Sequence, residues 1–244
     1  MEWQDEGIIL GAKKYGESSH IVTIFTPNNG KTAGLVKSSG SSGKKGNILQ
    51  LGNLVSIRWR SRLENNLGNF NLELIESYSF KLLDDPIKLS TLSSACALIE
   101  KTLPERESYQ DLYFEFKNFF QTISCDDWAK RYVEWEVLLL ETLGYGLDLS
   151  CCAATGVTNN LIYVSPKSGC AVCEEAGRSY QNRLLPLPLF LIKKDIQDVT
   201  KDDIAKGLKL TEYFLRRHVF NNDNIKIPFA RNRLAGFFIG NSNE

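Results

Sequence analysis

The sequence predicts an α+β protein in which an N-terminal, five-stranded β-barrel of the oligonucleotide-binding (OB) type precedes an all-α domain. Short apolar runs with turn signals fill the first 80 residues, and apolar residues take helical spacing from Asp85 onward. A stretch containing Cys and Gly interrupts the helical pattern at about 147–182. We therefore expect domains at 1–80 and 81–244, with a small insert in the second.

The first three strands are predicted by apolar runs at residues 8–10, 21–25 and 33–36. Between the last two runs stands Pro27-Asn28-Asn29-Gly30. Asn-Gly readily adopts positive φ angles, so this sequence predicts a two-residue hairpin turn. The three runs together indicate an antiparallel meander.

Two further strands complete the predicted module. Residues 53–60 alternate between apolar and polar, which is typical of a half-buried strand. Residues 67–80 follow, with Phe70, Leu72 and Leu74 on one side. Residues 37–46 are rich in Ser, Gly and Lys and predict a loop with a basic end. Five short strands favour a small OB barrel, and a split sandwich is the alternative.

Helices are predicted by four apolar stripes downstream of Asp85. The last begins after Thr200, which is suited to an N-cap, with acidic residues in the first turn. Gly144 and Gly146 close the third. The four stripes span residues 89–99, 112–123, 128–143 and 204–219.

Composition restricts the class of protein. The 244 residues are 43% hydrophobic and 24% charged, as in globular proteins, and the net charge is zero. Any contact with nucleic acid must therefore come from local patches. The acidic N-terminus predicts no secretory signal, and the longest apolar stretch, 184–192, is too short to cross a membrane. We expect a cytoplasmic protein with reduced cysteines.

Catalytic motifs are missing from the sequence. His20 and His218 belong to no metal-binding helix pair, and both are expected to be packing residues. There is no phosphate-binding Gly-x-x-x-x-Gly-Lys loop and no Gly-x-Ser-x-Gly nucleophile elbow. The sequence thus favours a protein that is not an enzyme. A metal-dependent hydrolase that uses the cysteine insert is the weakest alternative.

The cysteines of the insert have part of a zinc-site pattern. Cys170 and Cys173 have metal-ligand spacing, and Cys152 lies upstream at a gap close to that of a four-cysteine zinc ribbon. However, Cys151 and Cys152 are adjacent, and Thr155 stands where a fourth ligand is needed. We expect buried thiols and no bound metal. Cys96 and Cys125 lie in or beside the apolar helical stripes and are expected to be core residues.

Basic residues of the N-terminal module are candidates for binding a phosphate backbone. Arg58, Arg60 and Arg62 recur at every second position, which predicts a guanidinium row on one strand face. Two predicted loops add further lysines: the link between the first two strands and the loop rich in Ser, Gly and Lys. An ordinary solvated strand face is the equal alternative. The candidate DNA-binding residues are Lys13, Lys14, Lys37, Lys44, Lys45, Arg58, Arg60 and Arg62.

A second basic stripe is predicted on the last long helix and just beyond it. It is suited to an acidic peptide or a phosphate backbone, and an ordinary wet helix face is the alternative. The candidate partner or secondary DNA-binding residues are Lys209, Arg216, Arg217, Arg231 and Arg233.

Ordered motifs along nearly the whole chain resemble the RecO family of bacterial recombinational repair proteins. No single motif is decisive, but this many in register are specific. They are Glu-Gly-Ile-Ile-Leu at 6–10, Tyr-Gly-Glu-Ser-Ser at 15–19, Gly-Leu-Val-Lys at 34–37, Leu-Gly-Asn at 51–53, Trp-Arg at 59–60, Leu-Gly-Asn-Phe at 67–70, Glu-Val-Leu-Leu-Leu-Glu-Thr-Leu-Gly at 136–144, Leu-Asp-Leu at 147–149, Tyr-Val-Ser-Pro-Lys-Ser-Gly at 163–169 and Pro-Phe-Ala-Arg-Asn-Arg at 228–233.

The resemblance implies an OB barrel, a helical domain and a zinc-ribbon-like insert. It implies binding of single- and double-stranded DNA, annealing of complementary strands, and no chemical step. The implied partners are RecR, RecF in many organisms, and the acidic C-terminal tail of single-strand-binding protein (SSB), docked on the helical domain. The implied outcome is loading of RecA onto SSB-coated DNA by a nucleoid-associated protein.

This chain departs from the family pattern in two places. In the register of the two Cys-x-x-Cys pairs, Cys152 and Cys173 are the first cysteines, and Thr155 and Ala176 replace the second ones. This substitution argues against zinc. The loop at 38–46 is also poor in arginine, which predicts modest, salt-sensitive DNA binding. A protein adaptor whose barrel binds a partner protein and not DNA is the alternative function.

Overall fold

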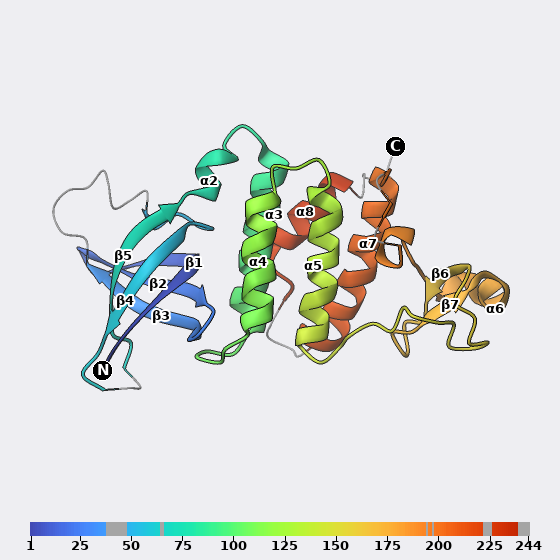
Figure 1. The fold of residues 1–244 in the computed structure, drawn as a ribbon, viewed down its shortest axis with the longest axis horizontal. Helices are drawn as coiled ribbons and strands as arrows, with labels where there is room; N and C mark the ends of the chain where they lie inside the picture. The colour runs from blue at the N-terminus through green and yellow to red at the C-terminus, as the bar shows by residue number, and fades with distance from the viewer. Residues whose placement is uncertain (38–47, 64–65, 194, 197, 222–225, 239–244) are drawn as a thin grey trace. The chain divides into compact units, whose positions relative to one another are not determined.

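The computed structural model describes residues 1–37, 48–63, 66–193, 195–196, 198–221 and 226–238 (Figure 1). The chain separates into two compact units. The first contains residues 1–124 and 228–231, and the second contains 125–227 and 232–244.

Five strands form the sheet of the first unit. They close into a ring in the order β1-β2-β3-β5-β4. Neighbours are antiparallel except β3 and β5, which meet in parallel at Leu35 and Asn69. The strands are β1 (Glu2–Tyr15), β2 (Ser19–Thr26), β3 (Gly30–Lys37), β4 (Leu54–Arg60) and β5 (Asn69–Glu76). The α+β class predicted from the sequence is confirmed.

The interior of the ring follows the predicted alternation. Val55, Ile57 and Trp59 of β4 point inward, and the residues between them are exposed. Phe70 is also buried, as predicted. Leu74, which was expected on the same side, is 43% exposed, so that part of the prediction was wrong. The apolar side of β5 therefore covers the ring only along its first half.

The hairpin between β2 and β3 differs from its predicted form. Thr26 pairs with Gly30, which leaves a three-residue loop instead of a two-residue turn. Gly30 has a φ of +59°, so it supplies the left-handed backbone. Asp5 closes the loop by accepting a hydrogen bond from the Asn29 side-chain amide at 2.9 Å. This polar anchor across β1 favours the longer loop.

Three helices complete the first unit: α2 (Tyr78–Lys81), α3 (Pro86–Thr102) and α4 (Gln110–Thr122). Phe25 of β2 packs edge-on against Tyr113 of α4, with ring centroids 5.4 Å apart. Glu6 of β1 accepts hydrogen bonds from Tyr113 at 3.1 Å and from Lys117 at 2.6 Å. Because of such contacts, α3 and α4 cluster with the sheet, whereas the sequence predicts a boundary after residue 80.

Helices α5 (Trp128–Thr142) and α7 (Lys201–Phe214) pack together in the second unit. Thr200 caps α7 in a reciprocal capping box with Asp203, as its sequence suggested. The chain continues as a π-helical segment, Leu215–Val219. Glu136 of α5 is fully buried and accepts hydrogen bonds from Tyr132 at 2.6 Å and from Thr211 at 2.5 Å. These bonds satisfy a carboxylate that would otherwise be costly to bury.

The insert of the second unit forms a small sheet of order β7-β6-β8. A last helix, α8 (Phe229–Phe238), follows Pro228 and was not predicted from apolar spacing. None of the helices in the described ranges is long and apolar enough to span a bilayer. The remaining elements are β6 (Leu161–Val164), β7 (Ala171–Cys173), α6 (Glu174–Gly177), β8 (Leu185–Pro186) and the 3-10 turns Arg178–Arg183 and Leu189–Leu191.

Candidate functional site

Two arginines stand on the outer face of β4 in the first unit. The side chains of Arg58 and Arg60 are 58% and 79% exposed. In the register of the sheet, Arg58 lies opposite Asn71 of β5, and Arg60 lies opposite Asn69. A row of guanidinium groups thus borders a row of amide side chains, which offer both donors and acceptors.

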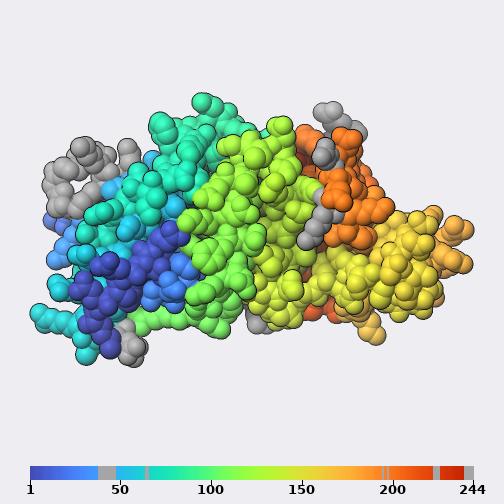
Figure 2. Space-filling view, in the orientation of Figure 1, coloured from blue at the N-terminus to red at the C-terminus, as the bar shows by residue number. Residues whose placement is uncertain are grey.

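Glu2 of β1 lies on the other side of this row. Its carboxylate oxygens are 3.7 Å from Nε of Arg58 and 3.3 Å from a terminal nitrogen of Arg60. In the space-filling view of Figure 2, the dark-blue start of the chain borders cyan residues, in agreement with the pairing of β1 with β4. The carboxylate therefore competes with any anion that approaches the two arginines.

We expect Glu2→Gln to strengthen binding of a single-stranded oligonucleotide at low salt, because two guanidinium groups lose a competing carboxylate. An exposed ion pair is worth about 0.2–1 kcal/mol, which corresponds to up to roughly fivefold in affinity. Fluorescence anisotropy with a labelled strand measures the change. Glu115→Gln, which removes the same charge from the exposed face of α4, is the control and should change affinity less. Equal effects of the two variants would contradict the role of Glu2.

A second basic group lies where the ends of β1 and β3 approach the start of β2. Tyr15 pairs with Ser19, and Ser19 pairs in turn with Lys37. Lys13 and Lys14 precede Tyr15, and both are exposed, as is Lys37. The register therefore brings three of the predicted lysines to one end of the sheet.

A cavity of about 360 Å³, which we call the slot, lies between β3 and β5. It is lined by residues 35–37 of β3, by 69–72 of β5, and by Ile48 and Leu49. The slot thus touches Lys37 on one side and the two asparagines beside the arginine row on the other. Sequence reasoning missed Asn69 and Asn71, although their alternation with Phe70 and Leu72 places them on the outer face.

Three of the predicted DNA-binding residues do not lie on the described strands. Lys44 and Lys45 lie outside the described residues. Arg62 is exposed, but β4 ends at Arg60, and the predicted strand row therefore contains only two arginines. The chain turns there because Ser61 is held by its N–H to the Met1 carbonyl at 3.0 Å and by its hydroxyl to the Leu63 carbonyl at 2.8 Å.

The candidate partner residues of the second stripe are divided between surface and interior. In the second unit, Lys209, Arg216, Arg217 and Arg233 are exposed. Arg216 donates to Glu212 at 2.7 Å and to Asn232 at 3.2 Å, and Arg217 donates to the Pro166 carbonyl. Arg231, which the structure groups with the first unit, is fully buried. The expectation that Arg231 contacts a partner is therefore corrected, because its side chain is not at the surface.

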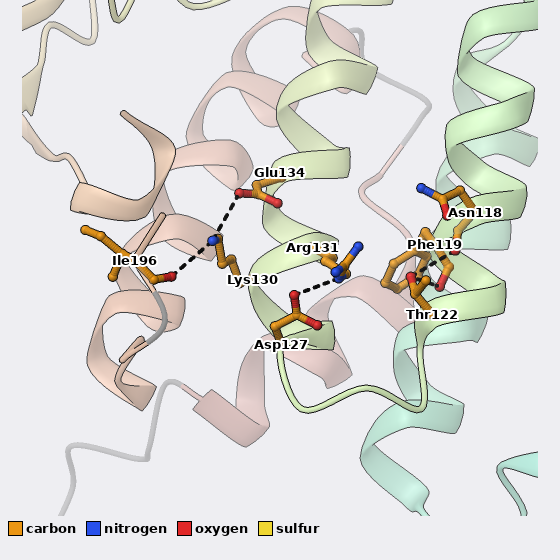
Figure 3. A network of polar contacts seen from close by, with 8 residues as sticks. All are labelled: Asn118, Phe119, Thr122, Asp127, Lys130, Arg131, Glu134 and Ile196. Atoms are coloured by element: carbon orange, nitrogen blue, oxygen red, sulfur yellow. Dashed lines mark hydrogen bonds and ion pairs between the residues drawn. The ribbon is translucent and has the colours of Figure 1, made fainter. Parts of the chain in front are cut away.

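A hollow of about 690 Å³ in the second unit has the wrong charge for a phosphate. Asp126, Asp127 and Asp195 line it together with Lys130. Lys130 donates to the Ile196 carbonyl at 3.1 Å and lies 4.0 Å from Glu134; Figure 3 draws both contacts as dashed lines. The hydrogen bond from Arg131, at 2.8 Å, holds the pKa of the Asp127 carboxyl below its usual value. The Asp127 carboxylate therefore stays ionised at neutral pH and repels an anion.

The cysteines of the insert do not fit a four-ligand zinc site. The backbone N–H of Cys173 donates to the sulfur of Cys152 at 3.2 Å, so these two residues converge. Thr155 lies beside them, with its hydroxyl 3.6 Å from the Cys173 sulfur. Within the described ranges, no three His, Cys, Asp or Glu side chains are grouped as metal ligands. Two thiols and a hydroxyl are a poor donor set for structural zinc.

The surroundings of the Cys152 thiol lower its pKa. Burial alone raises its pKa, but hydrogen bonds from the Thr155 hydroxyl and from nearby backbone N–H groups lower the pKa to about 6. The folded state therefore gains stability as pH rises from about 6 toward the ordinary thiol pKa of about 8.5 and loses it on acidification. Urea unfolding at pH 6 and pH 9 should show a smaller gain for Cys152→Ser than for the parent chain. Cys151→Ser is the control, and an unchanged gain in Cys152→Ser would contradict this ionisation.

Comparison with known protein families covers both halves of the chain. Residues 1–78 match the model "Recombination protein O N terminal", and residues 83–224 match "Recombination protein O C terminal". The chain belongs to the RecO family.

Curated RecO proteins are similar to this chain over nearly its full length. "DNA repair protein RecO" of Rhodospirillum centenum is 43% identical over 237 residues, which cover 96% of this chain and 94% of the relative. The protein of the same name from Bartonella quintana is 43% identical over 239 residues, 98% of each chain. That of a Wolbachia strain from Drosophila simulans is 42% identical over 238 residues, 95% of this chain and 98% of the relative. RecO membership assigns the chain to DNA repair.

Proposed function

We propose that this RecO-family chain is a DNA-binding mediator of recombinational repair that performs no chemical step. It binds single- and double-stranded DNA, anneals complementary strands, and with RecR helps to load RecA onto DNA coated with SSB. One observation carries the DNA-binding part. Arg58 and Arg60 stand exposed beside Asn71 and Asn69 on the outer face of the sheet.

The surface chemistry supports binding that does not depend on sequence. Guanidinium and ammonium groups neutralise phosphates, which position a strand but carry no sequence information. Their neighbours on β5 are amides. Lys37, at the C-terminal end of β3, and Lys14, which reaches that end through the pairing of β1 with β2, add further positive charge. The DNA contacts are therefore electrostatic first, and the affinity falls steeply with salt.

Titration of a labelled single strand at several salt concentrations tests this proposal. We expect a shift at low salt and a log–log slope of about −0.7 for each phosphate contact. A strand-annealing assay with two complementary oligonucleotides follows under the same conditions. No shift at low salt would overturn the proposal and favour the alternative, an adaptor whose sheet binds a partner protein.

A second part of the proposal concerns the acidic C-terminal tail of SSB. Lys209, Arg216, Arg217 and Arg233 offer positive charge in the second unit, and an acidic peptide is suited to such a surface. The Arg216 guanidinium already forms an ion pair with Glu212, so a carboxylate of the tail would replace the Glu212 carboxylate at this arginine. RecF is a further partner on the same family grounds. Arg216→Glu should weaken binding of a synthetic tail peptide, measured by anisotropy, and normal binding would remove Arg216 from this surface.

A further inference from the structure

We infer that the slot between β3 and β5 receives one unstacked base of a single DNA strand. This inference rests on the proposed DNA binding and adds to it a site for the base itself. The slot is formed wholly within the first unit. Its volume of about 360 Å³ lies within the range of small-molecule pockets, roughly 300–1,000 Å³.

The walls of the slot suit a flat, mainly apolar group with polar edges. Val36, Phe70 and Leu72 form the inner side of the slot. Val36 and Phe70 belong to the buried core cluster of the sheet, together with Val55, Ile57 and Trp59, and Leu72 packs against this cluster. Ile48 and Leu49 lie against the same cluster and cover a further side. These side chains favour a group that gains by leaving water, as the face of a base does.

The rim of the slot carries the groups that recognise a base edge. Asn69 and Asn71 line the opening and are exposed on the outer face of β5. Each amide has an acceptor oxygen and two donor hydrogens, so together they match the edge of any base. This arrangement gives affinity for bases without a strong preference among them.

The charges on both sides of the slot select a nucleic acid over an apolar peptide. Lys37 lines the β3 side, and Arg58 and Arg60 stand opposite the rim asparagines on the β5 side. A strand that crosses from β3 to β4 would place phosphates at both positions and a base between them. An apolar side chain of a protein would gain nothing from these cations.

The test compares two strands of equal length and charge. One is a thymidine oligonucleotide, and the other has every base replaced by tetrahydrofuran. We expect the chain to bind the thymidine strand at least about fivefold more tightly, which corresponds to the lower end of the free energies of base–aromatic contacts. The salt slope should be the same for both strands. Equal affinity with a full salt slope would overturn the slot and leave the proposed function standing. No binding of either strand at low salt would overturn the proposed function.

Variants then locate the site of any base preference. Leu49→Trp fills the slot and should bring the affinity ratio close to one without changing the salt slope, whereas Leu49→Ala should keep a preference. Asn71→Ala, at an exposed position with little risk to folding, should reduce the ratio by about half or more. A ratio that stays at the parent value in both Leu49→Trp and Asn71→Ala would place the base contact elsewhere and overturn the inference.

Discussion

Replacing both Arg58 and Arg60 with alanine should weaken binding of single-stranded DNA by roughly 25-fold in 0.1 M salt. The estimate takes two phosphate contacts, each contributing about 0.7 to the log–log salt slope. The slope itself should fall by about 1.4. The loss should be the same for strands of any sequence, because the guanidinium groups contact phosphates and not base edges. Anisotropy titrations over a salt series measure both quantities.

A matched pair of charges serves as the control for this prediction. Lys201→Ala with Lys206→Ala removes two positive charges from α7 in the second unit, where Lys206 is paired with Asp202 at 2.6 Å. This variant has the same net charge as the arginine pair variant. If both variants lose affinity equally, total charge and not the β4 row governs binding. An unchanged slope in the arginine variant would place the DNA face elsewhere.

Replacing Gly30 with alanine should lower the free energy of unfolding by roughly 2–5 kcal/mol. Part of this loss arises because alanine is strained in a left-handed backbone conformation, and the rest arises because the added methyl group overpacks a close contact. A Cβ atom at this position would lie 1.9 Å from the backbone carbonyl oxygen of Glu107. The obstacle is backbone, which a rotamer change cannot move aside. The linker before α4 is held there by the N–H of Arg106, which donates to the Lys31 carbonyl at 2.9 Å. Urea unfolding followed by circular dichroism measures the loss.

Gly16 provides the matched control for the Gly30 variant. It has a φ of +65°, close to that of Gly30, but no atom lies within 4 Å of its added Cβ. Gly16→Ala should therefore cost only the conformational part, about 1–2 kcal/mol. The difference between the two variants isolates the contact with Glu107. Equal losses of unfolding free energy in the two variants would show that the linker backbone at Glu107 moves aside at no energetic cost.

Much of the fold follows from the spacing of apolar residues. Apolar residues alternate in β4 and recur at helical spacing in α3, α4, α5 and α7. Each pattern arises because one face of the element is buried, so these elements can be predicted from the sequence. The extent of β1 does not follow in this way. Its apolar run covers only residues 8–10, yet the strand runs from Glu2 to Tyr15 because both ends pair with neighbours, β4 at one end and β2 at the other.

The candidate site was harder to predict than the fold. The sequence gives the charge of a side chain, but not its neighbours from distant segments. Arg58 and Arg60 were expected on one face and lie there, whereas Glu2 joins them only through the pairing of β1 with β4. Arg231 was expected to contact a partner from its charge, and it is buried. Burial of an arginine depends on tertiary packing, which no local pattern encodes.

The parallel meeting of β3 and β5 has a consequence for solubility. The two strands pair at one register position, Leu35 with Asn69, so the ring is joined there by a short seam. Strand edges next to such a seam invite pairing with another chain, and natural sheets oppose this with charged or polar side chains. Lys37, Asn69 and Asn71 stand at this place. The side chains proposed to meet DNA therefore also protect the sheet against edge-to-edge aggregation.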